Sequence, residues 1–514
     1  MELLLLLIVK TMPTITLLGI VSLCEVLFLK RERLRSKLRK QGISGPPPSF
    51  LLGNTRDAEK KIQSKPSKAP WEEEQIVIHN YSSTLFPFYE QCRKEYRPIF
   101  RFSLANMQLL YIDRPDVVRE ISMCTSLDLG KPSYQRKELG PLLGQGILTS
   151  NGAIWAHQRK TLAPELYPQK VKGMTNLMVE SSITLLNSWN DRIESEGGIA
   201  DIEVGEYMRS LSGDVIARAC FGSNYSKGKE IFFKLKAIQR ALSNKGVGWI
   251  RAMRYLPTKS NKEIWALEKE VRSLILKAVK ERKETTPLEK DLLQIILESA
   301  TNSGLGKTAT QRLIVDNCKN IYAAANDATA LSASWSLMLL ASNPEWQDRV
   351  RTEVIEICRG QLPDADMVRQ MKTLTMILYE SLRLYPPGPF VSREALQDIN
   401  IGEIYVPKGV IVRIPSLMLH HDPEIWGPDA DEFNPERFAN GVKGACKLPY
   451  VYMPFGVGPR KCLGQNFAMA ELKILLALVV SNFSLSLSPK YRHSPAQRLV
   501  IEPEHGVNLL IRRL

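Results

Sequence analysis

The chain has 514 residues, 44% of them hydrophobic and 24% charged, so it can bury a large core and is too apolar for extensive disorder. Its formal net charge is +15, yet the sequence contains no nucleic-acid-binding motif, and nucleic acid is not an expected partner. The eight cysteines are scattered without a CxxC pair, which argues against a disulfide scaffold or a zinc module and indicates a reducing, cytosolic environment.

The chain begins with a candidate membrane segment. Residues 11–29 are mostly apolar, and as a helix they would reach roughly 28 Å, about the thickness of the bilayer interior. A cleavable signal peptide is the alternative, but the run is long and lacks a small-residue cleavage site. Residues 30–40 follow with seven basic residues against Glu32, which places this side in the cytosol. We therefore expect residues 1–29 to form a single-pass anchor in the endoplasmic reticulum membrane.

A proline-rich segment follows the basic cluster. Gly45 is followed by three consecutive prolines, which lack the amide hydrogen and fix φ, so the segment cannot continue a helix. We interpret residues 30–48 as a basic and proline-rich hinge. Residues 49–514 contain no repeat and no second linker, and we expect them to form one large catalytic domain.

Within this domain, period-two patterns occur early and helical periodicity dominates later. The expected strands are Pro98–Phe102 and Gln108–Ile112. The clearest expected helices are Val171–Trp189, Lys262–Arg282, Gln311–Leu340, Glu345–Cys358 and Gly464–Val480. Loops rich in glycine and proline concentrate between residues 384 and 461. The pattern predicts a mainly α fold with a small β region.

The segment with the most specific chemistry is FGVGPRKCLG at residues 455–464. Its glycines allow the backbone to turn tightly against a flat cofactor, and Cys462 directly precedes a helical stretch. Amide groups at a helix N-terminus stabilise a thiolate. Arg460 can pair with a cofactor carboxylate, and Phe455 can shield the sulfur. The alternative is an ordinary glycine-rich turn with a buried free cysteine.

This segment resembles the haem-binding loop of the cytochrome P-450 superfamily, FxxGxRxCxG, and matches it at every fixed position. The resemblance implies the cytochrome P-450 fold and a b-type haem, iron protoporphyrin IX, whose fifth iron ligand is the Cys462 thiolate. It also implies a monooxygenase that uses O2 and a hydrophobic substrate. Electrons would come from NADPH through a membrane-bound cytochrome P-450 reductase, the expected protein partner.

A second pattern lies on the stretch TLTMILYESLRLYPP, where Glu380 and Arg383 are three residues apart and can pair on one helix face. The same spacing occurs at Glu356 and Arg359, so an ordinary surface pair is the alternative. The order of the segments, with Arg437 in a following PERF sequence, resembles the ExxR helix and PERF segment of the superfamily. It implies a buried Glu380–Arg383–Arg437 network that supports the haem loop and acts in folding.

Trp155 and Arg159 are one helical turn apart and resemble the WxxxR element of the superfamily. This resemblance implies that they hold a haem propionate, with Arg393 and Arg460 as further partners. A core tryptophan beside a surface arginine is the alternative.

The chain departs from the superfamily in the oxygen-activation helix, whose pattern (A/G)Gx(D/E)T(T/S) aligns with residues 324–329. Asp327 supplies the acid, but Ala328 stands where the superfamily has an alcohol. Thr329 follows, yet adjacent helix residues point about 100° apart. We place Asp327, Ala328 and Thr329 in the oxygen-handling site, where altered chemistry and a substitute proton source both remain open.

Phrases such as SNGAIWAHQRK, VDNCKNIY and DPEIWGPDADEFNPERF are similar to the plant family numbered 714 within the superfamily. This resemblance implies hydroxylation or epoxidation of a hydrophobic terpenoid, either a gibberellin-type diterpenoid or a triterpenoid. Three alternatives remain. They are a haem-thiolate enzyme that rearranges or dehydrates its substrate, a non-catalytic membrane-anchored binder of apolar ligands, and a scaffold without haem.

Overall fold

The computed structural model describes residues 29–50, 52–59, 77, 79–222, 225–243, 256–284, 291–302, 304 and 306–514. The expected anchor, apart from its last residue, lies outside this part of the chain. Within these ranges no helix combines the length and the apolar character that crossing a bilayer requires.

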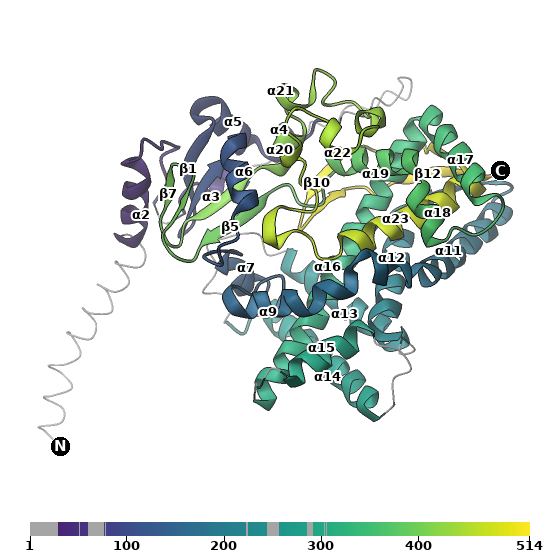
Figure 1. The fold of residues 1–514 in the computed structure, drawn as a ribbon, viewed down its shortest axis with the longest axis horizontal. Coiled ribbons are helices and arrows are strands. Elements are labelled where there is room, and N and C mark those ends of the chain that lie inside the picture. The colour runs from purple at the N-terminus through teal and green to yellow at the C-terminus, as the bar shows by residue number, and fades with distance from the viewer. Residues whose placement is uncertain are drawn as a thin grey trace, which may run out of the picture.

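The small β region is built around a five-stranded sheet with the order β1-β2-β8-β5-β3. Figure 1 labels β1 and β5 of this sheet. Strands β1 (Ile99–Leu104) and β2 (Met107–Ile112) form an antiparallel pair, and β2 runs parallel to β8 (Ile411–Ile414). On the other side of β8 lie β5 (Val391–Ala395) and then β3 (Leu129–Gly130), both antiparallel to their neighbours. The sheet thereby places early strands next to the segment that leads to the cysteine loop.

Three smaller sheets complete the β structure. Their strands are β4 (Ile199–Glu203), β12 (Asn508–Arg513) and β9 (Phe483–Leu487) in one sheet, β6 (Ile399–Ile401) with β7 (Ile404–Val406), and β10 (Pro495–Gln497) with β11 (Ile501–Pro503).

Helices make up most of the described chain. In the N-terminal half they are α2 (Lys30–Arg39), α3 (Thr55–Glu59), α4 (Ser82–Leu85), α5 (Pro87–Tyr96), α6 (Pro115–Met123), α7 (Ser133–Glu138), α8 (Gly140–Leu143), α9 (Gly152–Leu162), α10 (Pro168–Lys172), α11 (Thr175–Ser195), α12 (Val204–Phe221) and α13 (Tyr225–Ser243). The later helices are α14 (Lys259–Glu284), α15 (Leu292–Asn302), α16 (Lys307–Ser342), α17 (Pro344–Cys358), α18 (Ala365–Gln370), α19 (Lys372–Leu384), α20 (Ser416–His420), α21 (Pro423–Trp426), α22 (Gly441–Gly444) and α23 (Gln465–Asn482).

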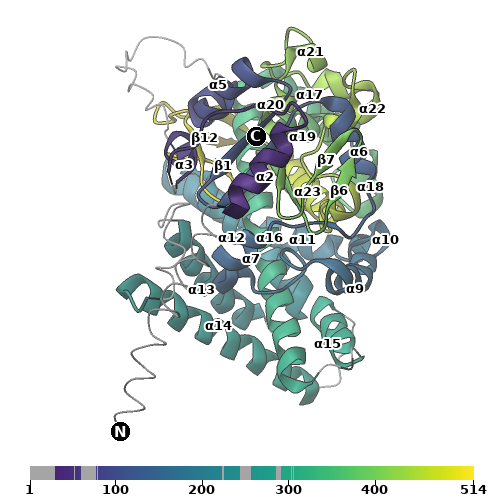
Figure 2. The same ribbon diagram turned by 90° about the vertical axis from the view of Figure 1, so that its left-hand side faces the viewer.

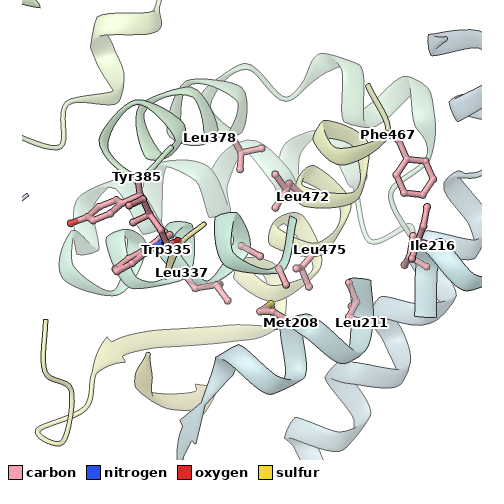
Figure 3. Packing of buried hydrophobic residues seen from close by; sticks show 14 of the residues in the cluster. Met208, Leu211, Ile216, Trp335, Leu337, Leu378, Tyr385, Phe467, Leu472 and Leu475 are labelled. Atoms are coloured by element: carbon pink, nitrogen blue, oxygen red, sulfur yellow. The ribbon is translucent and has the colours of Figure 1, made fainter. Parts of the chain in front are cut away.

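The core is organised around α16, which has 36 residues and is buried along most of its C-terminal two thirds. Small alanine and serine side chains alternate there with leucines, so neighbouring helices can approach closely. Figure 3 shows side chains of α12, α19 and α23 packed together with those of α16. Trp335 and Tyr385 stack with ring centroids 4.2 Å apart in this core.

The mainly α fold with a small β region agrees with the expectation from the sequence. Two details differ from the expectation. The expected helix Val171–Trp189 is interrupted at Gly173 and Met174, because α10 ends at Lys172 and α11 begins at Thr175. The segment between residues 384 and 461 contains strands β5 to β8 as well as loops, since β-branched residues alternate there between the glycines and prolines.

The basic segment after residue 29 is docked onto the sheet. In α2, Leu38 is completely buried and the Arg31 guanidinium donates to the Ala105 carbonyl in the β1–β2 turn. The Gln41 side chain and the backbone of Tyr405 in β7 exchange two hydrogen bonds of 2.9 Å. Figure 2 shows α2 lying across this edge of the molecule. Residues 30–41, expected within a hinge, are therefore held against the domain.

Candidate active site

The cysteine loop folds tightly between α6 and α23. Gly458 has a φ of +67°, and a Cβ there would lie 2.9 Å from the Ser122 carbonyl oxygen, so a larger residue would strain the turn. The Cys462 amide donates to the Phe455 carbonyl with an N–O distance of 2.7 Å. The helix α23 begins at Gln465, three residues after the cysteine. The loop thus presents Cys462 just before a helix, as the sequence indicates.

The Cys462 thiol is accessible although protein surrounds it closely. The resulting desolvation raises its pKa, while the Gly464 amide and the charges of Arg159 and Lys131 act in the opposite direction. These amide and cationic groups favour the thiolate, which is the form of cysteine that binds a metal.

Four cations gather around this loop. Arg460 donates to the Ser150 carbonyl at 3.0 Å, and its guanidinium carbon lies 4.2 Å from the centre of the Trp155 ring. Arg393 donates to the Val457 carbonyl at 3.1 Å. The other two cations are Arg159, which donates to the Lys461 carbonyl at 2.6 Å, and Lys131, whose backbone amide donates to Asn151 Oδ1 at 2.7 Å.

The charges of this cation cluster (Lys131, Arg159, Arg393 and Arg460) are poorly compensated. Burial lowers the pKa of Lys131 to about 7, with Arg393 and Arg460 adding to the effect. Burial likewise lowers the pKa of Arg393 and of Arg460 to about 10. In the part of the chain that the structure describes, none of the four cations forms a salt bridge with a carboxylate. Two anionic groups placed between them would relieve this cost, so the cluster fits the two propionates of a haem over Cys462.

Sequence reasoning missed Lys131. It follows the short strand β3 in an irregular segment and matches no fixed element of the loop or helix motifs. Only folding of the sheet brings the end of β3 next to β5, where Arg393 lies. No pattern in the sequence marked it.

The pair Glu380 and Arg383 is completely buried on α19. Arg383 donates from Nε and Nη2 to the two carboxylate oxygens of Glu380, both at 2.7 Å, and also to three backbone carbonyls. Glu380 further accepts from the Asn434 amide at 3.0 Å. Because the ion pair is fully hydrogen-bonded, it can exist without water, and it fixes two separate segments, at His420 and at residues 430–434, to α19.

Arg437 joins this pair less directly than the sequence implies. Its Nε lies 3.6 Å from Glu380 Oε1, whereas its Nη2 is 2.7 Å from Asp429 Oδ2. A second link was not anticipated. His420 accepts from the Met453 amide at 3.0 Å through Nε2, and burial lowers its pKa to about 3, so the ring is neutral. Met453 precedes Phe455 by two residues, and the network therefore reaches the cysteine loop.

The residues that we expect to handle oxygen lie on an unbroken part of α16. Asp327 accepts from the Gln239 side chain, and its Oδ1 lies 3.9 Å from Arg209 Nε, so the carboxylate is directed toward α12 and α13. Thr329 is buried, whereas Ala324 is exposed and Ala323, Ala325 and Ala328 are half-buried. The Ala328 carbonyl accepts from the Ser332 hydroxyl at 2.9 Å. The structure places Asp327, Ala328 and Thr329 on one segment but turns the acid away toward charged neighbours.

A second acid, Glu471, lies in the core on α23 and was not singled out from the sequence. It is 2% exposed, and neither of its carboxyl oxygens has a hydrogen bond of normal geometry. Burial raises its pKa to about 8, which a neighbouring hydroxyl, that of Ser212, only partly opposes. The same hydroxyl donates to the Ala325 carbonyl on α16 at 3.3 Å. Glu471 is therefore a buried protonated acid close to the oxygen-handling segment.

The phrase VDNCKNIY forms a clamp on the loop before α9. Asp316, Asn317 and Asn320 accept from the backbone amides of Gln145, Ile147 and Leu148 at 2.8, 3.1 and 2.8 Å. All three side chains are buried, so the loop is held by one face of α16.

Comparisons with known proteins agree with this geometry. The family model described as cytochrome P-450 matches residues 68–509. Cytochrome P-450 714C2 from Oryza sativa subsp. japonica is 48% identical over 95% of this chain and 95% of its own length. Cytochrome P-450 714B3 from Zea mays is 47% identical over 96% of this chain and 93% of its own, and cytochrome P-450 714A2 from Arabidopsis thaliana 45% over 93% of both.

The fold, the cysteine loop and these matches define a haem-thiolate oxidoreductase, and the chain belongs to the cytochrome P-450 family. Within that family its relatives carry the number 714, at 43% to 48% identity. Membership brings a b-type haem, electrons from NADPH delivered by a reductase, a substrate and O2.

Proposed function

We propose that this monooxygenase hydroxylates or epoxidises a hydrophobic plant terpenoid, either a gibberellin-type diterpenoid or a triterpenoid. The observation that carries the reaction type is Cys462 within the cation cluster. Support for a bulky, rigid substrate comes from α16, where Ala324 is exposed and alanines occupy positions 323 to 325 and 328. Small side chains on this helix leave room for a polycyclic skeleton.

We assign the following roles to the chain's own residues. Cys462 would hold the haem iron, and Trp155 packs on Arg460, one of the cations that would pair with the propionates. The Phe455 carbonyl fixes the backbone of Cys462 through the hydrogen bond that it accepts from the Cys462 amide. The haem supplies oxygen binding and reductive activation. Glu380 and Arg383, with Arg437 and Asp429, hold the supporting loops in place.

Proton supply is assigned to the polar groups beside Ala328. Asp327 faces Arg209 of α12, which also lies 3.7 Å from Glu502 of β11, so its carboxylate belongs to a charged cluster on this side of α16. Ala328 has no hydroxyl to pass a proton on, and Thr329 is buried. A proton must therefore reach the oxygen side of α16 through a water or a substrate hydroxyl.

We further propose that residues 1–29 anchor the enzyme in the endoplasmic reticulum membrane, with the domain that begins at residue 49 in the cytosol. The apolar run and the seven basic residues after it support this topology. Protease added to intact microsomes should digest the catalytic domain. Full protection of the domain would overturn the topology.

The reaction is tested in microsomes that contain this chain and a reductase, with NADPH and a panel of di- and triterpenoids. The reduced protein with carbon monoxide should show the red-shifted Soret band of a thiolate-bound haem, and Cys462→Ala should abolish it. Oxygenated product that depends on NADPH supports the proposal. Product without NADPH would indicate a rearranging or dehydrating enzyme, and tight binding without NADPH use would indicate a carrier.

A further inference from the structure

An arginine on the central sheet lacks the partner that its surroundings demand. Arg413 in β8 donates from Nη1 to the Tyr89 hydroxyl at 2.6 Å and is hydrogen-bonded to the Tyr134 hydroxyl. Its guanidinium carbon lies 5.1 Å from the centre of the Phe390 ring. Its neighbours are thus neutral aromatic side chains from α5, α7 and the segment before β5.

The charge of Arg413 has no counter-charge among the described residues. No salt bridge joins it to a carboxylate, and its Nε is buried without a hydrogen-bond partner. Burial lowers the pKa of Arg413, but Tyr89 and Tyr134 outweigh this effect and the pKa lies above its ordinary value, so the group is a cation. A partly buried cation whose buried Nε has no hydrogen-bond partner is costly, and an anion that binds beside the guanidinium offsets this cost.

The position of Arg413 separates it from the cation cluster. In the register of β5 and β8, Ser392 faces Arg413 and Arg393 faces Val412. Because neighbouring residues of a strand point to opposite faces, Arg413 and Arg393 lie on opposite faces of the sheet. Arg393 belongs to the cluster that fits the propionates, so Arg413 is not another ligand of that group.

The face that carries Arg413 is not fully closed to solvent. Arg413 itself is only half-buried, as are Tyr134 and Phe390. A Cβ added to Gly388, two residues before Phe390, would meet no atom within 4 Å. Tyr134 lies three residues after Lys131, which belongs to the cation cluster. A ligand that entered from this open side would meet the guanidinium.

We propose that Arg413, together with the hydroxyls of Tyr89 and Tyr134, binds the carboxylate of an acidic terpenoid substrate. The proposal rests on the terpenoid oxidation proposed above and names the polar end of its substrate. The planar guanidinium fork matches the geometry of a carboxylate, and each tyrosine hydroxyl that accepts from Arg413 keeps its own proton to donate to the anion. The flanking Phe390 ring suits an apolar skeleton attached to that group.

The test compares acid and ester forms of the same skeleton. Ferric holoenzyme is titrated with abietic acid, with its methyl ester, and with an oleanane acid and its methyl ester. Laurate and methyl laurate serve as a pair that does not depend on ring shape. Binding is followed by the Soret shift and independently by the rise in melting temperature. The parent should bind each acid about 10- to 100-fold more tightly than its ester, the range expected for hydrogen bonds to a charged group.

The variants locate the effect. Arg413→Gln should remove the preference for the acid and leave ester binding unchanged, and Tyr134→Phe should reduce the preference partly. Arg413→Lys keeps the charge but loses the fork, so it should retain an intermediate preference. Arg101→Gln is the matched control, because Arg101 lies in β1 of the same sheet and donates to the Ile43 carbonyl. This control should behave as the parent.

The outcomes separate the two proposals. Equal binding of acids and esters by the parent, or a preference that survives in Arg413→Gln, overturns the role of Arg413 while terpenoid oxidation can stand. A preference seen with laurate but no binding of any terpenoid overturns the terpenoid proposal and retains the anion site. A parent that prefers an alkyl sulfate to the carboxylate of equal chain length would refute a carboxylate site.

Discussion

The buried acid Glu471 makes a strong prediction about stability and pH. In the folded chain its pKa is about 8, against 4.5 for an ordinary glutamate. Between these values the folded protein binds one more proton than the unfolded chain, so stability falls as the pH rises. The slope is about 1.4 kcal/mol per pH unit, which amounts to about 3 kcal/mol at pH 7.

Glu471→Gln keeps the shape of the protonated acid and removes its titration. The extra N–H of the amide costs about 1 kcal/mol when it is buried without a partner, so the net gain at pH 7 is about 2 kcal/mol. An unfolding entropy of about 2 cal/mol/K per residue makes this a rise of about 2 °C in melting temperature. The difference from the parent should grow with each pH unit from 5 to 8.

The assay is thermal unfolding of the ferric holoenzyme in detergent at pH 5, 6, 7 and 8, read by the Soret band and by intrinsic fluorescence. Glu356→Gln on the exposed face of α17 is the matched control and should leave the pH profile of the parent unchanged. Parallel profiles for the parent and Glu471→Gln would refute the reasoning, because they would show that Glu471 is ionised in the folded protein.

Three further predictions concern the site. Lys131→Met should speed transfer of haem to apomyoglobin about tenfold, because the variant lacks one cation that faces the propionates, and the exposed Lys137→Met should not. Glu380→Gln should destabilise the fold by about 3 to 5 kcal/mol, because it leaves a buried guanidinium without its counter-charge. The loss is measured as a lower yield of haem-containing protein, and the exposed control Glu356→Gln should keep the yield of the parent. Ala328→Thr should raise product per NADPH and lower peroxide release if proton delivery is weakened, or change products if alanine suits the reaction. If Ala328→Thr matched the parent in product per NADPH, peroxide release and product identity, Ala328 would have no functional meaning.

The sequence was most informative where chemistry demands fixed spacing. Cys462 and the residues before it could be found because a tight turn, a thiolate and a helix start must follow one another in the chain. The pair Glu380 and Arg383 was also visible, since both lie on one helix face. The mainly α fold followed from the periodicity of long helices such as α16.

Residues that meet only in three dimensions could not be found in this way. Lys131 and Arg413 matter because the sheet places β3, β5 and β8 side by side, which no local pattern reports. Glu471 stands in an apolar helix, where one acid usually marks a solvent-exposed face, and its burial depends on how α23 packs against α12 and α16. Arg437 was expected beside Glu380, but its shorter contact is with Asp429, a residue that no motif singled out.

The contacts of α2 attach the basic segment rigidly to the catalytic domain. Because Leu38 is buried, Arg31 is hydrogen-bonded to the β1–β2 turn and Gln41 is hydrogen-bonded to β7, the chain from Lys30 onward is fixed to the domain. A torque applied at Lys30 is transmitted to β1 and β2 instead of being absorbed by a loose linker. Helix α2 therefore belongs to the rigid domain, and a truncation that removed it would also remove its contacts with the β1–β2 turn.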